Sequence, residues 1–145
     1  MILVLGGTSD SLEICDRINK YEDLPYTLSV TTSYGEDLAR KHAKNVITGK
    51  LTKEDMVRFI EKNNINKIID ATHPYAIEVS KNAIQCAKEL NIDYLRYERK
   101  SLIEDISYEN KYIVSSIEEA CKIAREKGRN IFIGTGSKNL PKIVE

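Results

Sequence analysis

Short aliphatic runs that alternate with segments of helical period are the feature that most limits what this chain can fold into. The runs are ILVL (2–5), TLSVTT (27–32), NVIT (45–48), KIIDAT (67–72), DYLRY (93–97), YIV (112–114) and NIFIG (130–134). Strands that alternate with helices in this way favour right-handed crossovers and a parallel sheet with helices on both faces. The pattern therefore predicts an α/β fold.

The segments between the runs carry the apolar spacing of amphipathic helices. SIEEACKIAREKG has apolar residues at i, i+3, i+4 and i+7, with Ser115 or Ser116 to cap its start and Gly128 to end it. Residues 76–90 repeat this pattern, and residues 53–63 carry a narrower apolar stripe. We expect a helix in each of these segments.

Charge and hydropathy exclude several classes of protein. Lys plus Arg and Asp plus Glu each number 22, so no net charge attracts nucleic acid or an anionic membrane surface. No apolar run approaches the roughly 20 residues that span a bilayer, and Asp10 comes too soon after the first run for a signal peptide. We expect a cytoplasmic protein without a nucleic-acid or membrane partner, and the sequence leaves its oligomeric state open.

The cysteines and histidines show no metal-site spacing. Cys15, Cys86 and Cys121 are scattered among apolar residues and form no CxxC pair, which is typical of small core residues in a reducing compartment. His42 and His73 have no second ligand at useful spacing. We therefore expect no bound metal.

A domain boundary is expected near residues 98–111, where ERKSLIEDISYENK is polar and has neither period. The prediction is a nucleotide-binding-like domain over 1–98 and, over 99–145, the start of a second, similar α/β domain. IFIGTGS near the end of the chain echoes ILVLGGTS at its start, and Glu145 follows before another full helix can form. We expect a truncated part of a two-domain protein, unless a very short helix finishes the chain.

Parallel sheets bind ligands at the carboxyl ends of their strands, near the point where strand order reverses. The first such end carries Gly6 and Gly7, whose backbones can approach a pyrophosphate closely. Thr8 and Ser9 add hydroxyl donors at the start of a helix. A dinucleotide fingerprint has the spacing GxGxxG, and this turn has fewer glycines. On spacing alone, a phosphate site and a plain turn capped by Ser9 both stay open.

The second strand end is TTS, where an NAD site usually presents an acidic residue to the ribose. The hydroxyls of Thr31, Thr32 and Ser33 stand there instead. With Arg40 and Lys41 nearby, these hydroxyls suit a 2′-phosphate better than a diol, which favours NADPH. The alternative is a polar strand end that caps a helix.

DATHPYA is the most unusual segment of the chain. Pro74 stiffens the turn and can occupy the first turn of a helix. His73 and Tyr75, on either side of it, can orient a nicotinamide or a substrate carboxylate, although a lone histidine equally fits a structural role. Asp70 either belongs to this site or caps the helix that begins at Pro74.

YLRYERK places Arg96, Arg99 and Lys100 together at the fifth strand end. Arginine binds carboxylates through two parallel hydrogen bonds, so this cluster suits an anionic substrate. The alternative is a solvated charge run, paired with Glu98 and Glu104.

Taken in order, GGTSDS, SVTTSYG, DATHPYA, YLRYER and GTGSKNL resemble the precorrin-6A reductase family, which includes the cobalt-precorrin-6A reductases of the anaerobic cobalamin pathway. The likeness runs from Met1 to Lys138. It implies a Rossmann-like reductase that passes hydride from NADPH or NADH to a double bond of precorrin-6A and gives precorrin-6B. It also implies a second domain, with the cofactor and the tetrapyrrole in the cleft between the two.

The resemblance implies a role for each matched segment. Cofactor-binding residues are Gly6, Gly7, Thr8 and Ser9 at the pyrophosphate, Thr32, Ser33 and Gly35 near the adenosine ribose, Asp70, Thr72 and Pro74 on the nicotinamide side, and Gly136, Ser137 and Lys138 from the second domain. His73 and Tyr75 are the candidate general acids, although solvent can also supply the proton. Arg96 and Arg99 are the candidate ligands of the substrate's acidic side arms.

Several alternatives stay open at this level. The family's anaerobic members are described with NADH, whereas TTS favours NADPH, and the sequence does not separate a cobalt-containing from a metal-free substrate. A regulatory module that binds a dinucleotide without catalysis is the main competing function. An isomerase on an extended nucleotide-binding fold usually needs a YxxxK pair, which Tyr75, followed by Glu78 and Lys81, does not form.

Overall fold

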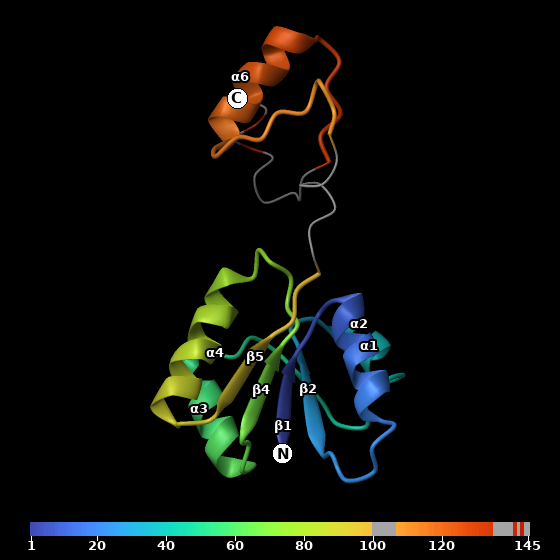
Figure 1. Ribbon diagram of the computed structural model, residues 1–145, viewed down its shortest axis with the longest axis vertical. Helices are drawn as coiled ribbons and strands as arrows, with labels where there is room; N and C mark the ends of the chain where they lie inside the picture. The colour runs from blue at the N-terminus through green and yellow to red at the C-terminus, as the bar shows by residue number, and fades with distance from the viewer. Residues whose placement is uncertain (100–106, 135–140, 142, 144–145) are drawn as a thin grey trace. The chain divides into compact units, whose positions relative to one another are not determined.

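A five-stranded parallel sheet organises the first part of the chain, as Figure 1 shows for the computed structural model. Its strands are β1 (Ile2–Leu5), β2 (Tyr26–Val30), β3 (Val46–Thr48), β4 (Lys67–Asp70) and β5 (Asp93–Arg96). The strand order is β3-β2-β1-β4-β5, and every neighbouring pair is parallel. The predicted α/β fold with a parallel sheet is confirmed.

The structure describes residues 1–99, 107–134, 141 and 143. They fall into two units, Met1–Lys100 and Ser101–Glu145, which we describe separately. The first unit holds the sheet with α1 (Ser9–Ile18), α2 (Ser33–Ala39), α3 (Lys53–Lys62) and α4 (Ile77–Glu89), and the second holds α6 (Ile117–Lys127). Within these described ranges, no helix is both long enough and apolar enough to cross a membrane.

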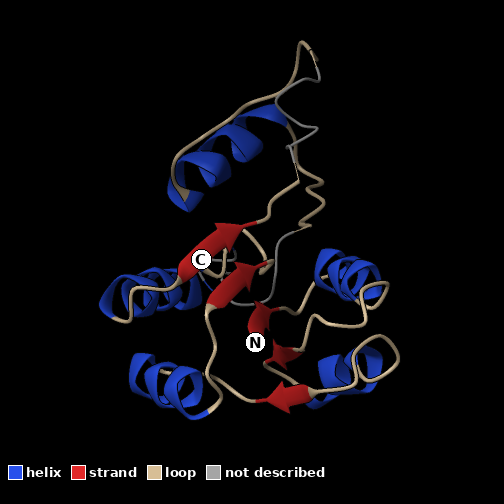
Figure 2. Ribbon diagram, turned by 60° about the horizontal axis from the view of Figure 1, so that its bottom comes forward, coloured by secondary structure: helices blue, strands red, loops and turns tan. Residues whose placement is uncertain are grey.

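Alternating side chains of β1 divide the core of the first unit between the two faces of the sheet. Leu3 and Leu5 pack with α3 and α4, around the fully buried Met56. Val4 points to the opposite face and packs with α1 and α2, next to the buried Cys15. Helices therefore cover both faces, as Figure 2 shows.

Hydroxyl side chains begin most of the helices. Thr8 caps α1, Thr32 caps α2, Thr52 caps α3 and Ser116 caps α6, and each hydroxyl accepts a hydrogen bond from a backbone N–H three residues further on. Helix α4 differs, because its N-cap is Ala76 and no side chain caps it. This difference leaves the segment before α4 to be held by other contacts.

The start of α4 corrects two expectations. Pro74 does not open the helix, because a hydrogen bond of 2.8 Å from the Ala76 N–H to the His73 carbonyl closes a separate turn first. The helix begins only at Ile77, so Asp70 does not cap it.

Helices α3 and α4 end in the same way. Asn64 and Asn91 both have a φ of 51°, in the left-handed region that asparagine tolerates better than most residues. The N–H of the following isoleucine, Ile65 or Ile92, bonds back to the last turn of its helix at 3.0 Å. This is the Schellman ending, and it directs the chain straight into β4 and β5.

The second unit departs from the sequence prediction. The runs at 112–114 and 130–134, which we expected to be strands, have no strand pairing in the described part of the unit. Ile113 and Phe132 are accordingly 75% and 95% exposed. A strand needs a neighbour to take its backbone hydrogen bonds, and the described residues supply none. Helix α6 is present as expected, begins after Ser116 and ends at Gly128.

The cysteines follow the same division between the units. Cys15 and Cys86 are fully buried in the first unit, as predicted. Burial raises the pKa of the Cys15 thiol to about 11, so this side chain stays a neutral thiol at physiological pH. Cys121 lies on α6 and is only partly buried, because α6 buries none of its residues in the described part of its unit.

Truncation of Met56 tests the core between the sheet and α3. We expect Met56→Ala to lower the free energy of unfolding by about 2 to 5 kcal/mol, because it leaves a cavity among fully buried neighbours. Glu61→Ala, on the exposed side of the same helix, should change that free energy by no more than about 0.5 kcal/mol. Urea unfolding followed by circular dichroism measures both, and equal effects would contradict the burial of Met56.

Candidate functional site

Three strand ends meet at one edge of the sheet. In the register of the sheet, Leu5 of β1 lies beside Ser29 of β2 and beside Asp70 of β4. Beyond these positions the Gly6 N–H donates to the Ser29 carbonyl at 2.9 Å, and the Ala71 N–H donates to the Leu5 carbonyl at 3.0 Å. The chain order reverses here, because β2 follows on one side of β1 and β4 lies on the other. This is the place where open α/β sheets bind ligands.

A cavity of about 360 Å³ opens between the starts of α1 and α2 at this edge. Its walls come from the turn after β1, the end of β2 and residues of α1 and α2. The lining residues are Gly7, Thr8, Ser9, Ser11, Leu12, Val30, Thr31, Thr32, Tyr34, Gly35 and Leu38. All of these side chains are uncharged. A ligand in this cavity would therefore meet hydroxyls, backbone groups and apolar surface.

The two glycines of the first turn have different structural roles. Gly7 has a φ of +104°, and a Cβ built there would meet no atom within 4 Å. It leaves open space above the turn, which is what the close approach of a phosphate group to the backbone requires. A Cβ on Gly6 would lie 2.7 Å from Leu28 Cδ1 and 2.9 Å from Ser11 Oγ. Gly6 therefore allows close packing beneath the turn, and it does not line the cavity.

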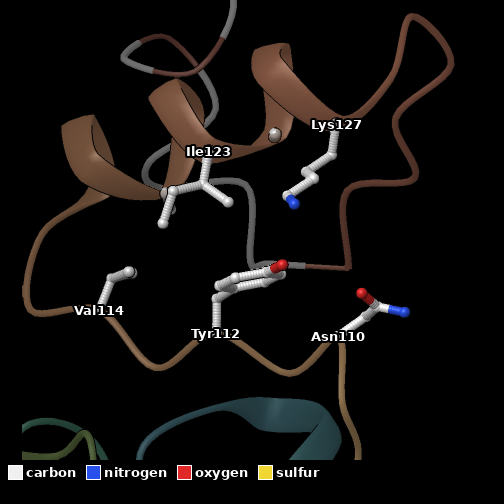
Figure 3. Close-up of a pocket in the computed structure, with 7 residues that line it drawn as sticks. Asn110, Tyr112, Val114, Ile123 and Lys127 are labelled. Atoms are coloured by element: carbon white, nitrogen blue, oxygen red, sulfur yellow. The ribbon is translucent and has the colours of Figure 1, made fainter.

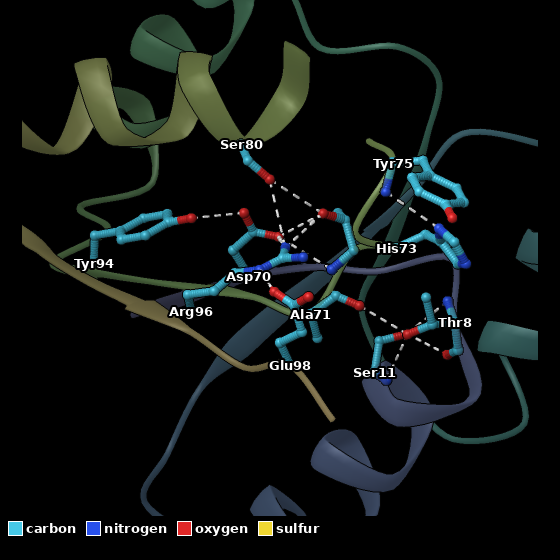
Figure 4. Close-up of polar contacts among 11 residues, drawn as sticks. Thr8, Ser11, Asp70, Ala71, His73, Tyr75, Ser80, Tyr94, Arg96 and Glu98 are labelled. Carbon is cyan, nitrogen blue, oxygen red and sulfur yellow. Dashed lines mark hydrogen bonds and ion pairs between the residues drawn. The ribbon is translucent and has the colours of Figure 1, made fainter. Parts of the chain in front are cut away.

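The Thr8 hydroxyl joins two turns at the edge of the sheet (Figure 4). It accepts a hydrogen bond of 3.2 Å from the Ser11 N–H, which caps α1, and donates one of 2.7 Å to the Ala71 carbonyl beyond β4. The Ser11 hydroxyl donates back to the Thr8 carbonyl at 2.6 Å. The cap of α1 is thus Thr8, one residue before Ser9, the residue that the sequence suggested.

Asp70 is fully buried at the end of β4 and is surrounded by donors (Figure 4). Its Oδ1 accepts the Thr72 N–H at 3.0 Å, the Thr72 hydroxyl at 2.7 Å and Arg96 Nη1 at 2.7 Å. Its Oδ2 accepts the Tyr94 hydroxyl at 2.7 Å. Burial alone would raise the pKa of this carboxyl, but the hydroxyls of Ser80, Thr72 and Tyr94 outweigh burial and lower it. Asp70 is therefore ionised, with both oxygens bonded inside the first unit.

His73 and Tyr75 lie on the turn that follows. The Tyr75 side chain is 88% exposed, and the two ring centroids are 5.0 Å apart. The Tyr75 N–H donates to His73 Nδ1 at 3.2 Å, which leaves Nε2 to carry the hydrogen of the neutral ring. Both side chains thus hold a polar hydrogen at the carboxyl edge of the sheet.

Each arginine predicted near the site binds a carboxylate of the first unit. Arg40 follows the last turn of α2 and donates from Nε to Glu36 Oε1 at 2.9 Å. Arg96 binds Asp70, and Arg99 forms an ion pair with Asp10 in the first turn of α1. The pairing of Arg40 with Glu36 does not separate NADPH from NADH, so the NADPH preference stays a prediction.

The structure brings together part of the predicted cofactor site. Of those residues, Gly7, Thr8, Ser9, Thr32 and Gly35 line the cavity. Asp70, Thr72 and Pro74 belong to the neighbouring strand end and turn, and Ser33 begins α2 without lining the cavity. Gly136, Ser137 and Lys138 lie outside the described residues.

Sequence reasoning missed the apolar wall of the cavity and one of the donors to Asp70. Leu12 and Leu38 line the cavity from the two helices, and Tyr34 lies at the start of α2. Their signal was an apolar or aromatic side chain in the helix that follows each strand end. Tyr94 was missed because its partner is 24 residues away, although it precedes Arg96 by two and therefore shares its face of β5.

The second unit contains a cavity of its own, of about 490 Å³ (Figure 3). Its lining joins the apolar side of α6, which includes Ile123, to the extended segment that carries Tyr112 and Val114. Lys127 Nζ lies 5.2 Å from the centre of the Tyr112 ring, a cation–π contact. None of the predicted site residues lines this cavity, so we place the candidate site in the first unit.

The whole chain, residues 1–145, matches the family model described as precorrin-6x reductase CbiJ/CobK. The chain belongs to this family. It is 43% identical over 144 residues to the cobalt-precorrin-6A reductase of Methanocaldococcus jannaschii, an alignment that covers 99% of this chain and 57% of that protein. It is 44% identical over 146 residues to the cobalt-precorrin-6A reductase of Priestia megaterium, covering 100% of this chain and 56% of that protein.

The chain thus spans little more than half the length of these relatives. Among solved structures it resembles a CobK precorrin-6A reductase, with a TM-score of 0.57 and 22% identity over 68% of this chain and 39% of that one. This likeness supports the α/β fold, and the family model confirms the resemblance seen in the motifs.

The hydroxyl of Thr8 can be tested by replacement. We expect Thr8→Val to lower the free energy of unfolding by about 1 to 3 kcal/mol, because it removes both the cap of α1 and the bond to the Ala71 carbonyl. Thr8→Ser keeps the hydroxyl and should lie within about 1 kcal/mol of the unaltered chain. Urea unfolding measures the difference, and equal losses in the two variants would show that the hydroxyl does not hold the turn.

Proposed function

We propose that the protein that carries this chain reduces one double bond of precorrin-6A or its cobalt complex with NADPH or NADH, giving the corresponding precorrin-6B in cobalamin biosynthesis. The observation that carries the proposal is the cavity over Gly7 at the ends of β1 and β2, in a chain of the CbiJ/CobK family. The names of the two relatives reported above support the cobalt-containing substrate.

The cavity suits the adenosine and pyrophosphate part of a nicotinamide dinucleotide. Gly7 would let the pyrophosphate approach the backbone, and Thr8 and Ser9 would hold it at the positive end of α1. Thr32 would lie near the ribose, and the ring of Tyr34 offers an aromatic surface to the adenine. When bound, the reduced nicotinamide would supply the hydride.

The turn after β4 would serve the substrate side of the site. Reduction of a double bond needs a proton as well as a hydride, and His73 and Tyr75 both hold a polar hydrogen there. Arg99, which forms an ion pair with the partly buried carboxylate of Asp10, is our candidate ligand for a carboxylate arm of the tetrapyrrole. Arg96 is already bound to the buried Asp70, so we assign it to holding the turn.

We further propose that residues 1–98 act as the nucleotide-binding-like domain and that residues 99–145 begin a second α/β domain. Gly136, Ser137 and Lys138 would then contribute to the cofactor site from that domain. The echo between the segments at 2–9 and 131–137 supports this division.

Titration calorimetry with NADPH and NADH tests the cofactor site. We expect the full-length protein to bind at least one of them, and Gly7→Val to weaken that binding at least tenfold, because the side chain fills the open space and strains the backbone. Gly128→Ala is the matched control, since a Cβ there meets nothing within 4 Å and its φ of −176° suits any residue. Binding of neither nucleotide would refute the reductase.

Turnover tests the catalytic part of the proposal. We expect oxidation of the nucleotide only when precorrin-6A or its cobalt complex is supplied, and binding without such oxidation would favour the regulatory module. In the active protein, His73→Ala or Tyr75→Phe should lower kcat roughly 100-fold or more if that side chain delivers the proton. Normal kcat at saturating substrate in both variants would assign proton delivery to solvent.

A further inference from the structure

The pairing of β4 in the sheet does not require the buried, ionised side chain of Asp70. An ionised group taken out of water costs several kcal/mol, and apolar replacements of buried ion pairs often leave stability equal or higher. The sheet itself pairs through the backbone at this position, where the Tyr97 N–H donates to the Asp70 carbonyl at 2.9 Å. Yet four hydrogen bonds converge on the two side-chain oxygens. These four hydrogen bonds therefore have a role beyond the pairing of the sheet.

They hold the turn that precedes α4. The start of this helix has no capping side chain, and the turn's own hydrogen bonds, at His73, Tyr75 and Ala76, do not reach the sheet. In the part of the chain that the structure describes, three side-chain links tie the turn to the strand ends. They run from Thr72 to Asp70, from Arg96 to the Thr72 hydroxyl, and from the Thr8 hydroxyl of the first turn to the Ala71 carbonyl.

Tyr94 sets the orientation of the carboxylate. Its ring packs against the core cluster of Leu3 and Ile68, so its hydroxyl reaches Asp70 Oδ2 from a fixed position on β5. Burial and the adjacent carboxylate raise the pKa of Tyr94 well above its usual value, so the hydroxyl remains a donor at neutral pH. With Oδ2 held in this way, Oδ1 is directed to Thr72.

Arg96 completes the arrangement from the other side. Its Nη1 donates to Asp70 Oδ1 at 2.7 Å and to the Thr72 hydroxyl at 2.9 Å, and it lies 3.4 Å from Ser80 Oγ on α4. The same guanidinium nitrogen thus contacts the strand end, the turn and the helix (Figure 4). Charge-assisted bonds of this kind are the strong ones, and the Asp70 carboxylate that accepts one of them is fully buried.

We propose that Tyr94 is a positioning residue of the candidate site, which orients Asp70 so that Thr72 and the turn carrying His73 and Tyr75 keep one conformation. The effect on catalysis rests on the proposed reductase function, since the turn faces the substrate only in that function. The effect on the turn itself does not depend on any ligand.

Amide hydrogen exchange, followed by NMR on the chain without ligands, tests the structural part. Tyr94→Phe removes one oxygen and keeps the ring in the core. We expect the Thr72 amide to exchange at least tenfold faster in this variant, while the amide of Val4 in the central strand keeps its rate. Tyr21→Phe, at a tyrosine that is 66% exposed, is the matched control and should change neither amide. An unchanged Thr72 amide, or equal acceleration of Thr72 and Val4, would overturn the proposal.

Kinetics of the full-length protein test the functional part. We expect Tyr94→Phe to lower kcat about tenfold and to leave the affinity for the nucleotide within twofold, because the cavity is lined by other residues. Faster exchange at Thr72 with an unchanged kcat would refute a role in catalysis. If the unaltered protein neither binds nucleotide nor turns over tetrapyrrole, the reductase function fails, and the exchange rates still decide whether Tyr94 holds the turn.

Discussion

The parallel pairing of β1 with β2 on one side and with β4 on the other is the constraint on which the site depends. Because all three strands run in the same direction and in register, the chain leaves them at the same level of the sheet. The turn after β1 then lies within hydrogen-bonding distance of the turn after β4, and one hydroxyl, that of Thr8, bonds to both. Helices α1 and α2 begin beside these ends, so the cavity between them follows from the pairing.

Charge around this edge is neutralised in pairs, while the cavity is lined by uncharged groups. Asp70 is matched by Arg96, Asp10 by Arg99 and Glu36 by Arg40. An anionic ligand in the cavity would thus be bound mainly by hydroxyls, backbone N–H groups and the positive end of α1. Such a site would recognise phosphate by geometry more than by net charge, which agrees with a chain whose formal charge is zero.

Local pattern predicted most of the fold, and long-range contacts account for most of what it missed. The five strands and the helices of the first unit follow from period and capping residues, and Gly7 could be found because a tight turn with an open approach needs glycine. The roles of Thr8 and Asp70 depend on partners 63 and 24 residues away, which periodicity does not reveal. The expected strands at 112–114 and 130–134 had the right composition, but a strand forms only beside a partner.

The left-handed turns at Asn64 and Asn91, here called the asparagine corners, precede β4 and β5 and affect the site at the other end of these strands. Side chains alternate along a strand, so the number of residues between Asn64 and Asp70 decides which face receives the carboxylate. The count from Asn91 to Tyr94 and Arg96 does the same for their side chains. One residue inserted in either corner would turn these side chains away from α4, although the corner lies at the opposite edge of the sheet. The loop lengths before the amino ends of β4 and β5 thus help to determine which side chains form the site. Homologues that keep this site should keep both corners free of insertions.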